Sequence, residues 1–200
     1  MTAHAAPSRI AQVQRKTNET DISLRLNLDG AGQTDINTGI GFLDHLLTAL
    51  AFHARFDLEL ACTGDLHIDD HHTAEDCALA LGSAMDQALG DRVGIRRFAD
   101  AHAPLDEALA RAVVDLSGRP HAEVRLDLQR DTVGALACEN IAHVLRSLAI
   151  NSRTTLHVDV LRGDNDHHKA EAAFKAVALA FRAAVARDGS SITPSTKGAL

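Results

Sequence analysis

Apolar and polar residues alternate along four short segments of the chain, which is the pattern of a strand with one buried face. These segments are residues 22–28, 56–60, 122–128 and 156–160. Apolar residues also recur with the period of an amphipathic helix over about residues 41–53, 72–89, 137–149 and 168–188. Each half of the chain is therefore predicted to begin rich in strand and to continue as helix, strand and helix.

Two histidine patterns recur in the same order in both halves. The pattern HHxxE runs from His71 to Glu75 and again, 96 residues later, from His167 to Glu171. A single histidine among apolar residues precedes each copy, and these two, His45 and His143, are 98 residues apart. Features that repeat at one spacing indicate duplication. We expect an α+β fold of two duplicated βα half-domains, each a small, mostly antiparallel sheet covered by helices, packed as one unit.

The predicted boundaries follow from this repeat. The first half-repeat covers residues 1–90, the second covers residues 91–189, and residues 190–200 form a polar C-terminal tail. The halves meet through residues 91–105, where Gly, Pro and charged residues gather. No long flexible linker separates them, so we expect a single compact domain.

Composition excludes several classes of protein. A chain of 200 residues with 46% hydrophobic content builds a core without disulfides or metals. No apolar run approaches the roughly 20 residues of a membrane helix, and residues 1–10 lack the pattern of a secretion signal. A net charge of −7 disfavours partners such as nucleic acid or an anionic membrane. Three scattered cysteines fit a reducing compartment, so we expect a cytoplasmic protein.

The chain contains 12 histidines, and those of the repeat indicate metal binding. Residues i and i+4 share a helical face, so His71 and Glu75 can bind one metal, while the adjacent histidine faces a different centre. With His45 and His143 the set offers six imidazoles and two carboxylates, enough for two four-ligand sites. Such ligands suit Mn, Fe, Ni or Zn. His53, eight residues beyond His45 on a similar face, is expected to line the same pocket.

Six further motifs point to a known family. They lie at residues 15–20, 41–45, 64–76, 103–108, 115–120 and 194–198, and the most specific is the run GDLHIDDHHTAED at residues 64–76. With these motifs the chain resembles imidazoleglycerol-phosphate dehydratase of histidine biosynthesis from about residue 9 to its end. The resemblance implies a homo-oligomer of 24 subunits, two Mn²⁺ ions per active site, metal sites where subunits meet, and no organic cofactor.

The same resemblance implies roles for individual residues. One metal takes His45, His72, His167 and Glu171, and the other takes His71, Glu75, His143 and His168. The phosphate of the substrate is bound by Arg97, Arg119, Lys175, Ser195, Thr196 and Lys197. The candidate acid–base groups are Glu19 and Glu171. The remaining side chains expected to contact the substrate are Glu19, His45, His53, His71, His72 and His167.

The implied hydro-lyase reaction is loss of water from D-erythro-imidazole glycerol phosphate, which gives imidazole acetol phosphate. An imidazole ring between two metal ions can lose its proton, because the metals stabilise the negative ring, and it can then assist the elimination. The ligand set by itself leaves two alternatives open. One is a dinuclear metallohydrolase, and the other is a non-catalytic protein whose subunits are assembled by metal.

Overall fold

The computed structural model describes residues 8–200 of the chain. The segment 1–10, for which the absence of a secretion signal was predicted, lies mostly outside the described residues. In the second strand, β2 (Thr20–Asn27), the apolar residues Ile22, Leu24 and Leu26 are buried, while those between them are exposed or half-buried. Within residues 8–200 no helix combines the length and the hydropathy that crossing a bilayer requires.

The first half of the chain forms a four-stranded sheet in the order β1-β2-β4-β3. Its elements, besides β2, are β1 (Ile10–Lys16), β3 (Thr34–Asn37), α1 (Gly41–Ala54), β4 (Asp57–Gly64) and α2 (His71–Leu89). β1 and β4 pair with β2 in antiparallel fashion, and β3 pairs with β4 in parallel. The connection from β3 to the parallel β4 runs through α1, as a parallel pair requires.

The second half repeats this arrangement. Its elements are β5 (Phe98–Leu105), β6 (Ala108–Asp115), β7 (His121–Arg125), α3 (Cys138–Asn151), β10 (Thr155–Arg162) and α4 (Asp166–Ala184), with a hairpin of β8 (Thr132–Val133) and β9 (Leu136–Ala137) before α3. The strand order is β5-β6-β10-β7, and only β7 and β10 pair in parallel. The predicted α+β fold of two duplicated halves is therefore confirmed.

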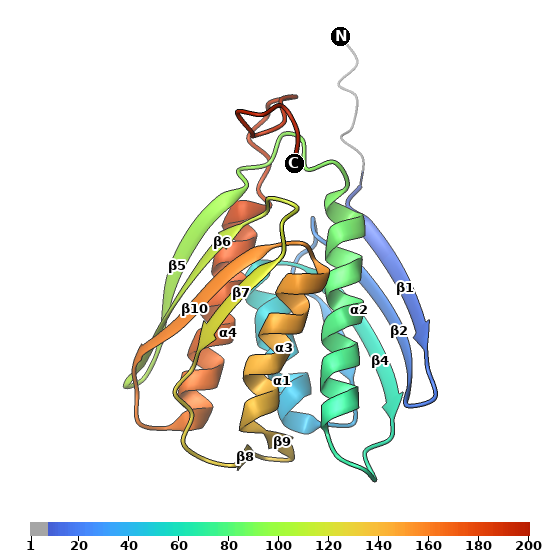
Figure 1. Ribbon diagram of the computed structural model, residues 1–200, viewed down its shortest axis with the longest axis vertical. Helices are drawn as coiled ribbons and strands as arrows, with labels where there is room; N and C mark the ends of the chain where they lie inside the picture. Colours follow the sequence, from blue (N-terminus) through green and yellow to red (C-terminus); the bar gives the residue numbers. More distant parts are fainter. Residues whose placement is uncertain (1–7) are drawn as a thin grey trace.

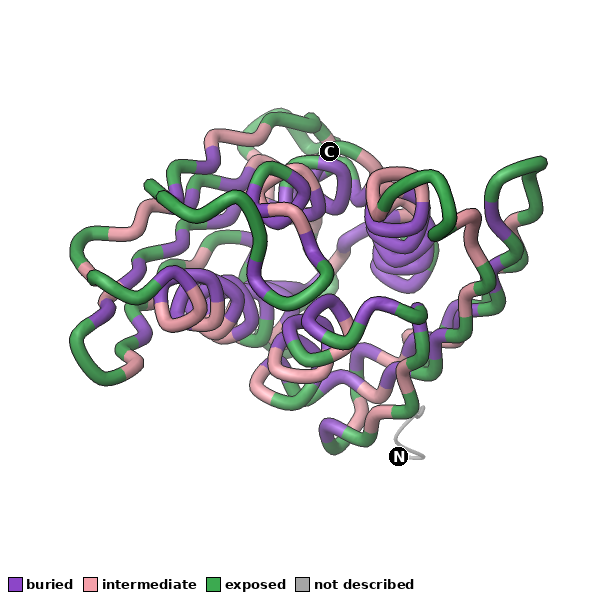
Figure 2. Tube along the Cα trace, turned by 90° about the horizontal axis from the view of Figure 1, so that it is seen from below, coloured by how far each residue is buried: buried purple, intermediate pink, exposed green. Residues whose placement is uncertain are grey.

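The four helices lie between the two sheets, so each sheet buries one face and turns the other outward (Figure 1). α2 packs on β1 and β2, and α4 packs on β5 and β6. The helices also pair across the halves, α1 with α4 and α2 with α3. In the view from below, the buried parts of helices and strands face the middle of the molecule (Figure 2). This pairing across the halves decides which histidines can meet.

β5 and β6 have no counterpart among the segments for which the sequence predicted strands. The inner face of β6 consists mainly of alanine, with Ala110 and Ala112 fully buried against α4. Alanine is only weakly apolar, so the alternation along these strands is faint. Its small side chain nevertheless allows close approach of the helix, and Phe174 and Phe181 of α4 fill the core there.

Two predicted elements end earlier in the structure. The strand expected over residues 122–128 ends at Arg125, and the helix expected to run to residue 188 ends at Ala184. The backbone N–H of Arg97 donates to the carbonyl of Ala184 over 3.0 Å. The end of α4 is thus held by the segment that leads into β5, and this contact between distant parts of the chain stops the helix.

Candidate metal and active site

The first cluster joins α1 of the first half to α4 of the second half. His45 Nε2 lies 2.9 Å from Glu171 Oε2, and His167 Nε2 lies 3.2 Å from the same oxygen. The potential ligand atoms of these three residues lie within 4.8 Å of one another, as a shared metal ion requires. His167 and Glu171 stand at positions i and i+4, so one turn of α4 presents both to His45.

The second cluster has the same arrangement, but here the HHxxE pattern comes from the first half and the single histidine from the second half. His143 Nε2 of α3 lies 3.1 Å from Glu75 Oε1, and His71 Nε2 of α2 lies 3.8 Å from Glu75 Oε2. The rings of His71 and His143 are stacked with centroids 5.1 Å apart. Each HHxxE pattern therefore meets the single histidine of the other half, because α1 packs on α4 and α2 packs on α3.

The second histidine of each HHxxE pattern points away from these clusters. His72 Nδ1 lies 3.0 Å from Asp65 Oδ2, and His168 Nδ1 lies 2.8 Å from Glu107 Oε2. The hydrogen bond with Asp65 raises the pKa of His72, and that with Glu107 raises the pKa of His168. Within one chain, each predicted set of four ligands is thus represented by three residues that meet and one that lies elsewhere.

Glu171 is ionised in this environment. Burial acts to raise its pKa, but hydrogen bonds from Lys175 and His45 outweigh burial and lower the pKa to about 2. Lys175 Nζ lies 2.7 Å from Glu171 Oε1, one turn further along α4. Burial lowers the pKa of His53, and the charge of nearby Lys175 lowers it further. Lys175 and His53 therefore both lie near the first cluster, one on α4 and the other on α1.

The other predicted phosphate ligands gather at the far end of the molecule. Arg97 is buried, and its Nε and Nη2 donate to the two carboxylate oxygens of Asp115 over 2.7 and 3.1 Å. Its Nη1 donates to the carbonyl of Pro194 over 2.7 Å, which ties the C-terminal turn to β6. Arg119 Nη2 lies 3.7 Å from Asp115. Ser195, Thr196 and Lys197 follow Pro194 in that turn, where Ser195 Oγ accepts from the backbone of Lys197.

Glu19 lies at the turn between β1 and β2, where its Oε1 is 3.6 Å from His72 Nε2. In the second half the turn between β5 and β6 places Glu107 against His168 in the same way. Sequence reasoning missed Asp65, Glu107 and Asn140, which all hold histidine rings. Asp65 and Glu107 fall within the quoted motifs, and that membership was a usable signal, whereas no quoted motif contains Asn140.

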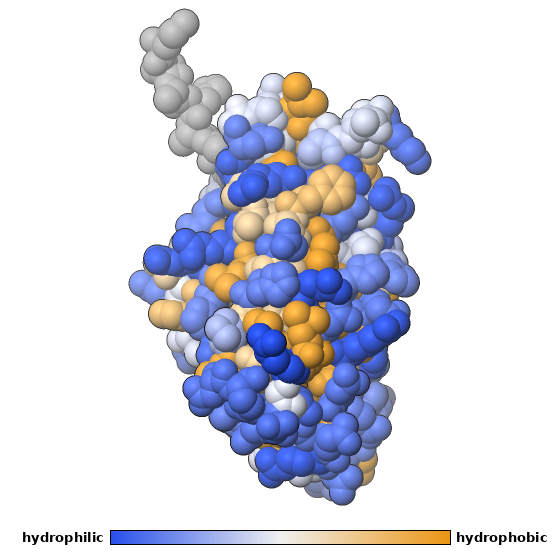
Figure 3. All heavy atoms as spheres, turned by 90° about the vertical axis from the view of Figure 1, so that its left-hand side faces the viewer, coloured by the Kyte–Doolittle hydropathy of each residue, from blue (hydrophilic) through white to orange (hydrophobic). Residues whose placement is uncertain are grey.

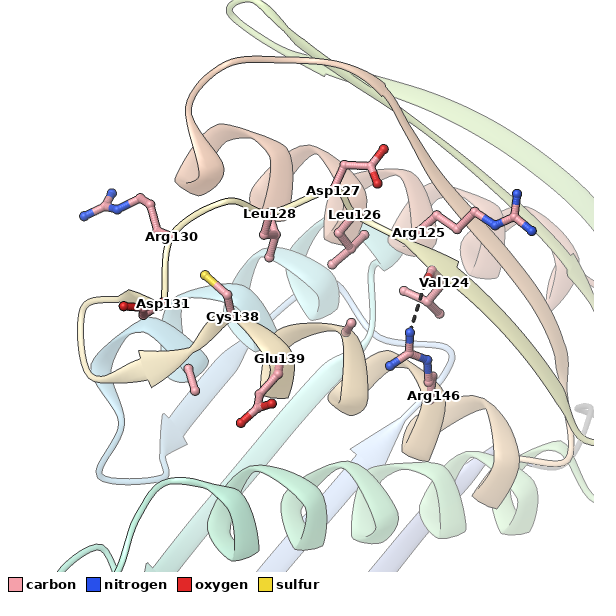
Figure 4. A pocket seen from close by; sticks show the side chains of 12 residues that line it. Val124, Arg125, Leu126, Asp127, Leu128, Arg130, Asp131, Cys138, Glu139 and Arg146 are labelled. Atoms are coloured by element: carbon pink, nitrogen blue, oxygen red, sulfur yellow. Dashed lines mark hydrogen bonds between the residues drawn. The ribbon is translucent and has the colours of Figure 1, made fainter.

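A groove of about 660 Å³ lies apart from both clusters. It runs between α3 and the segment after β7 (Figure 4). Arg146 reaches across one end of it and donates to the carbonyl of Val124 over 3.1 Å. No residue predicted to bind metal or substrate lines this groove. The repeated histidines therefore lie outside this groove.

Comparisons with known proteins agree with this picture. The sequence model of imidazoleglycerol-phosphate dehydratase matches residues 38–181. The chain is 58% identical to the protein of that name from Phytophthora nicotianae, covering 100% of this chain but 46% of the relative. It is 52% identical to the one from Saccharomyces cerevisiae, covering 95% of this chain and 97% of the relative. The crystal structure from Staphylococcus aureus has a TM-score of 0.81 at 36% identity and covers 89% of this chain and 99% of that chain.

Proposed function

Because the chain belongs to the imidazoleglycerol-phosphate dehydratase family, we propose that it removes water from D-erythro-imidazole glycerol phosphate to give imidazole acetol phosphate. This hydro-lyase reaction is a step of histidine biosynthesis. The observation that supports it most is the pair of equivalent His/Glu clusters in a chain whose entire length aligns with that family. The three cysteines of the described residues are free, in keeping with a proposed cytoplasmic location.

The residues of the clusters fit divalent metal ions. Each cluster offers two imidazoles and one carboxylate, no thiolate takes part, and Glu171 is ionised with a pKa of about 2. Imidazole and carboxylate ligands suit Mn²⁺, which we propose as the metal, two per active site and without an organic cofactor. When bound, such ions act as Lewis acids that stabilise negative charge on an imidazole ring.

The active site is proposed to be shared between subunits. The first cluster lies at the start of α4 and the second at the start of α2, while Arg97 contacts the end of α4. Glu171 precedes Ala184 by 13 residues of α4, so the cluster and Arg97 are separated by about 20 Å at about 1.5 Å per residue. One small substrate does not span that length, so we propose that Arg97, Arg119 and the C-terminal turn bind the phosphate of a substrate whose ring lies at the clusters of a different chain. In a proposed assembly of 24 subunits, His72 and His168 of neighbouring subunits would likewise complete the two ligand sets, each of which has three residues in one chain.

Within this site the protein's own groups bind the phosphate and move the proton. Arg119 presents an exposed guanidinium group suited to bidentate phosphate contacts. Arg97, whose guanidinium binds Asp115 and the carbonyl of Pro194, is proposed to add positive charge beside it, and Ser195, Thr196, Lys197 and Lys175 add hydroxyls and ammonium groups. Elimination removes a proton from one carbon of the side chain and a hydroxyl from the next, so a carboxylate must hold that proton. Glu19 and Glu171 are the proposed groups.

Replacing Glu19 by Gln should lower kcat by about 100-fold or more, because proton transfer by a positioned side chain contributes about that much. Glu19 belongs to neither His/Glu cluster, so Mn²⁺ content should remain that of the unchanged protein. Steady-state turnover and metal analysis of the same samples check both statements. Glu59→Gln, on the outer face of β4, is the control and should keep full turnover. Full turnover of Glu19→Gln with metal bound would remove Glu19 from proton transfer.

Replacing Arg119 by Ala should raise KM about tenfold or more with a small change in kcat, because a charge-assisted hydrogen bond to phosphate is lost. Arg119 is 66% exposed, so its removal tests binding without disturbing the core, unlike removal of the buried Arg97. Arg125→Ala, at a site 68% exposed at the end of β7, is the matched control. A KM for Arg119→Ala equal to that of the control would take Arg119 out of the phosphate site.

The function itself is tested by incubating the purified protein and Mn²⁺ with D-erythro-imidazole glycerol phosphate and, in parallel, with simple phosphoesters. Formation of imidazole acetol phosphate supports the dehydratase. Release of phosphate from the esters without dehydration would favour the dinuclear hydrolase instead. A protein that binds metal but neither substrate nor a triazole mimic of the imidazole ring would be a metal-assembled, non-catalytic one, since structural sites are coordinatively closed.

A further inference from the structure

The two clusters repeat the same ligands but differ in the residue that holds the first HHxxE histidine. Three positions before the single histidine stands Phe42 in α1 and Asn140 in α3. Asn140 Oδ1 accepts a hydrogen bond from His71 Nδ1 over 3.0 Å. The Phe42 ring instead packs against His167, with centroids 4.9 Å apart and planes tilted by 48°. The duplication has thus kept the ligands and changed their immediate neighbours.

We propose that Asn140 is a positioning residue for metal binding, and that it makes the cluster of His71, Glu75 and His143 the tighter of the two metal sites. This inference rests on the proposed metal-dependent function. It concerns the order and strength of metal binding, which the family assignment leaves open. The two clusters then fill in sequence as the metal concentration rises, the one beside Asn140 first.

The reason is the tautomer that Asn140 imposes. Its Oδ1 is a carbonyl oxygen that only accepts, so the proton of a neutral His71 must sit on Nδ1, which leaves the lone pair of Nε2 free. His71 Nε2 is the atom that faces Glu75, at 3.8 Å from Oε2. Asn140 is only 3% exposed, so helix packing holds the acceptor in place. Such acceptors behind metal-binding histidines typically raise metal affinity by about 10–100-fold.

The cluster of His45, His167 and Glu171 has no such support. Within residues 8–200 no acceptor is found for His167 Nδ1, and the ring contacts Phe42, His45 and His168 instead. Moreover, Lys175 Nζ lies 2.7 Å from Glu171 Oε1, so a metal ion would share that carboxylate with an ammonium group. For Glu75, the ion pairs of the described residues involve only His71 and His143. Both differences weaken metal binding at the first cluster relative to the second.

The test is a Mn²⁺ titration of the chelator-treated full chain, followed through the electron paramagnetic resonance signal of free Mn²⁺. The unchanged protein should show a tight and a weak class of site. Asn140→Leu, similar in size but without the acceptor, should weaken the tight class by about 10–100-fold and spare the weak class. Asn140→Asp keeps an acceptor and should retain tight binding. Phe42→Leu, the matched control in the other half, should leave the tight class unchanged.

The inference would be overturned if the unchanged protein bound Mn²⁺ at two sites of equal affinity, or if Asn140→Leu left the affinity of both sites unchanged. Neither result would affect the dehydratase assay. Absence of Mn²⁺ binding altogether would overturn the metal-dependent function as well. Crystals of the unchanged protein grown with one Mn²⁺ per chain test the proposal without depending on whether a variant folds. Their anomalous signal should be stronger beside Asn140, and equal or stronger signal beside Phe42 would contradict the proposal.

Discussion

Stripping the protein of divalent metal should lower its turnover of imidazole glycerol phosphate by about three orders of magnitude or more, and returning Mn²⁺ should restore it. A metal acting as a Lewis acid contributes several kcal/mol to transition-state stabilisation, and about 1.4 kcal/mol corresponds to tenfold in rate. Without metal, the two clusters leave imidazoles and carboxylates that have no comparable means of stabilising charge on the ring of the substrate.

The measurement compares initial rates of chelator-treated protein before and after addition of Mn²⁺, with circular dichroism to verify that the fold is retained. His121→Ala is the matched control, because His121 lies on the outer face of its sheet near His157 and outside both clusters. It should show the same dependence on metal as the unchanged protein. Full turnover by well-folded, metal-free protein would disprove metal dependence, and no turnover with any divalent ion would disprove the dehydratase function.

Local signals in the sequence were sufficient to predict the repeat and the helices that bear it. The helices expected near residues 41–53, 72–89 and 137–149 correspond closely to α1, α2 and α3. The reason is that each has apolar residues at helical spacing, and that the histidine patterns of both halves lie at equivalent places on these helices. A duplication leaves this record in a single sequence, and the repeated sheet topology follows from it.

The partners of each histidine could not be derived from spacing. Whether His45 meets the HHxxE pattern of its own half or that of the other depends on α1 packing against α4. Helix packing is determined by complementary surfaces of distant segments, which a local pattern does not contain. The resemblance to the family implied the mixed sets, and a single chain brings together three residues of each set.

The segment at residues 91–105 shows that the burial of a charged residue also cannot be derived from a local pattern. It was interpreted as the junction between halves because it contains Gly, Pro and charges, yet Arg92 within it is only 4% exposed. The guanidinium of Arg92 donates to the carbonyls of Ser152 and Arg153, over 2.8 and 3.0 Å, at the end of α3. It also pairs with Asp86 of α2. The two carbonyl acceptors lie 60 and 61 residues away in the chain, and the one nearby partner, Asp86, does not by itself indicate that this arginine is buried.

This arrangement predicts that Arg92→Ala destabilises the protein by about 3–5 kcal/mol, the cost of removing one partner from a buried, charged network. The substitution leaves the Asp86 carboxylate with only the more distant Arg153, at 3.8 Å, and removes the donors to two carbonyl groups. Arg92→Lys keeps the charge but not the planar fork of donors, so it should recover only part of the loss. Denaturant unfolding of metal-free protein, at one protein concentration to hold any subunit equilibrium fixed, measures the difference.

Arg111→Ala is the matched control, because Arg111 pairs with Asp159 on the exposed outer face of the second sheet. An exposed ion pair contributes about 0–1 kcal/mol, so the unfolding midpoint of this variant should stay close to that of the unchanged protein. An Arg92→Ala variant as stable as the control would mean that water replaces the guanidinium at the carbonyls of Ser152 and Arg153. A large loss for Arg92→Ala alone would instead show that one buried arginine joins α2 to α3, and thereby supports the two helices that supply His71, Glu75 and His143.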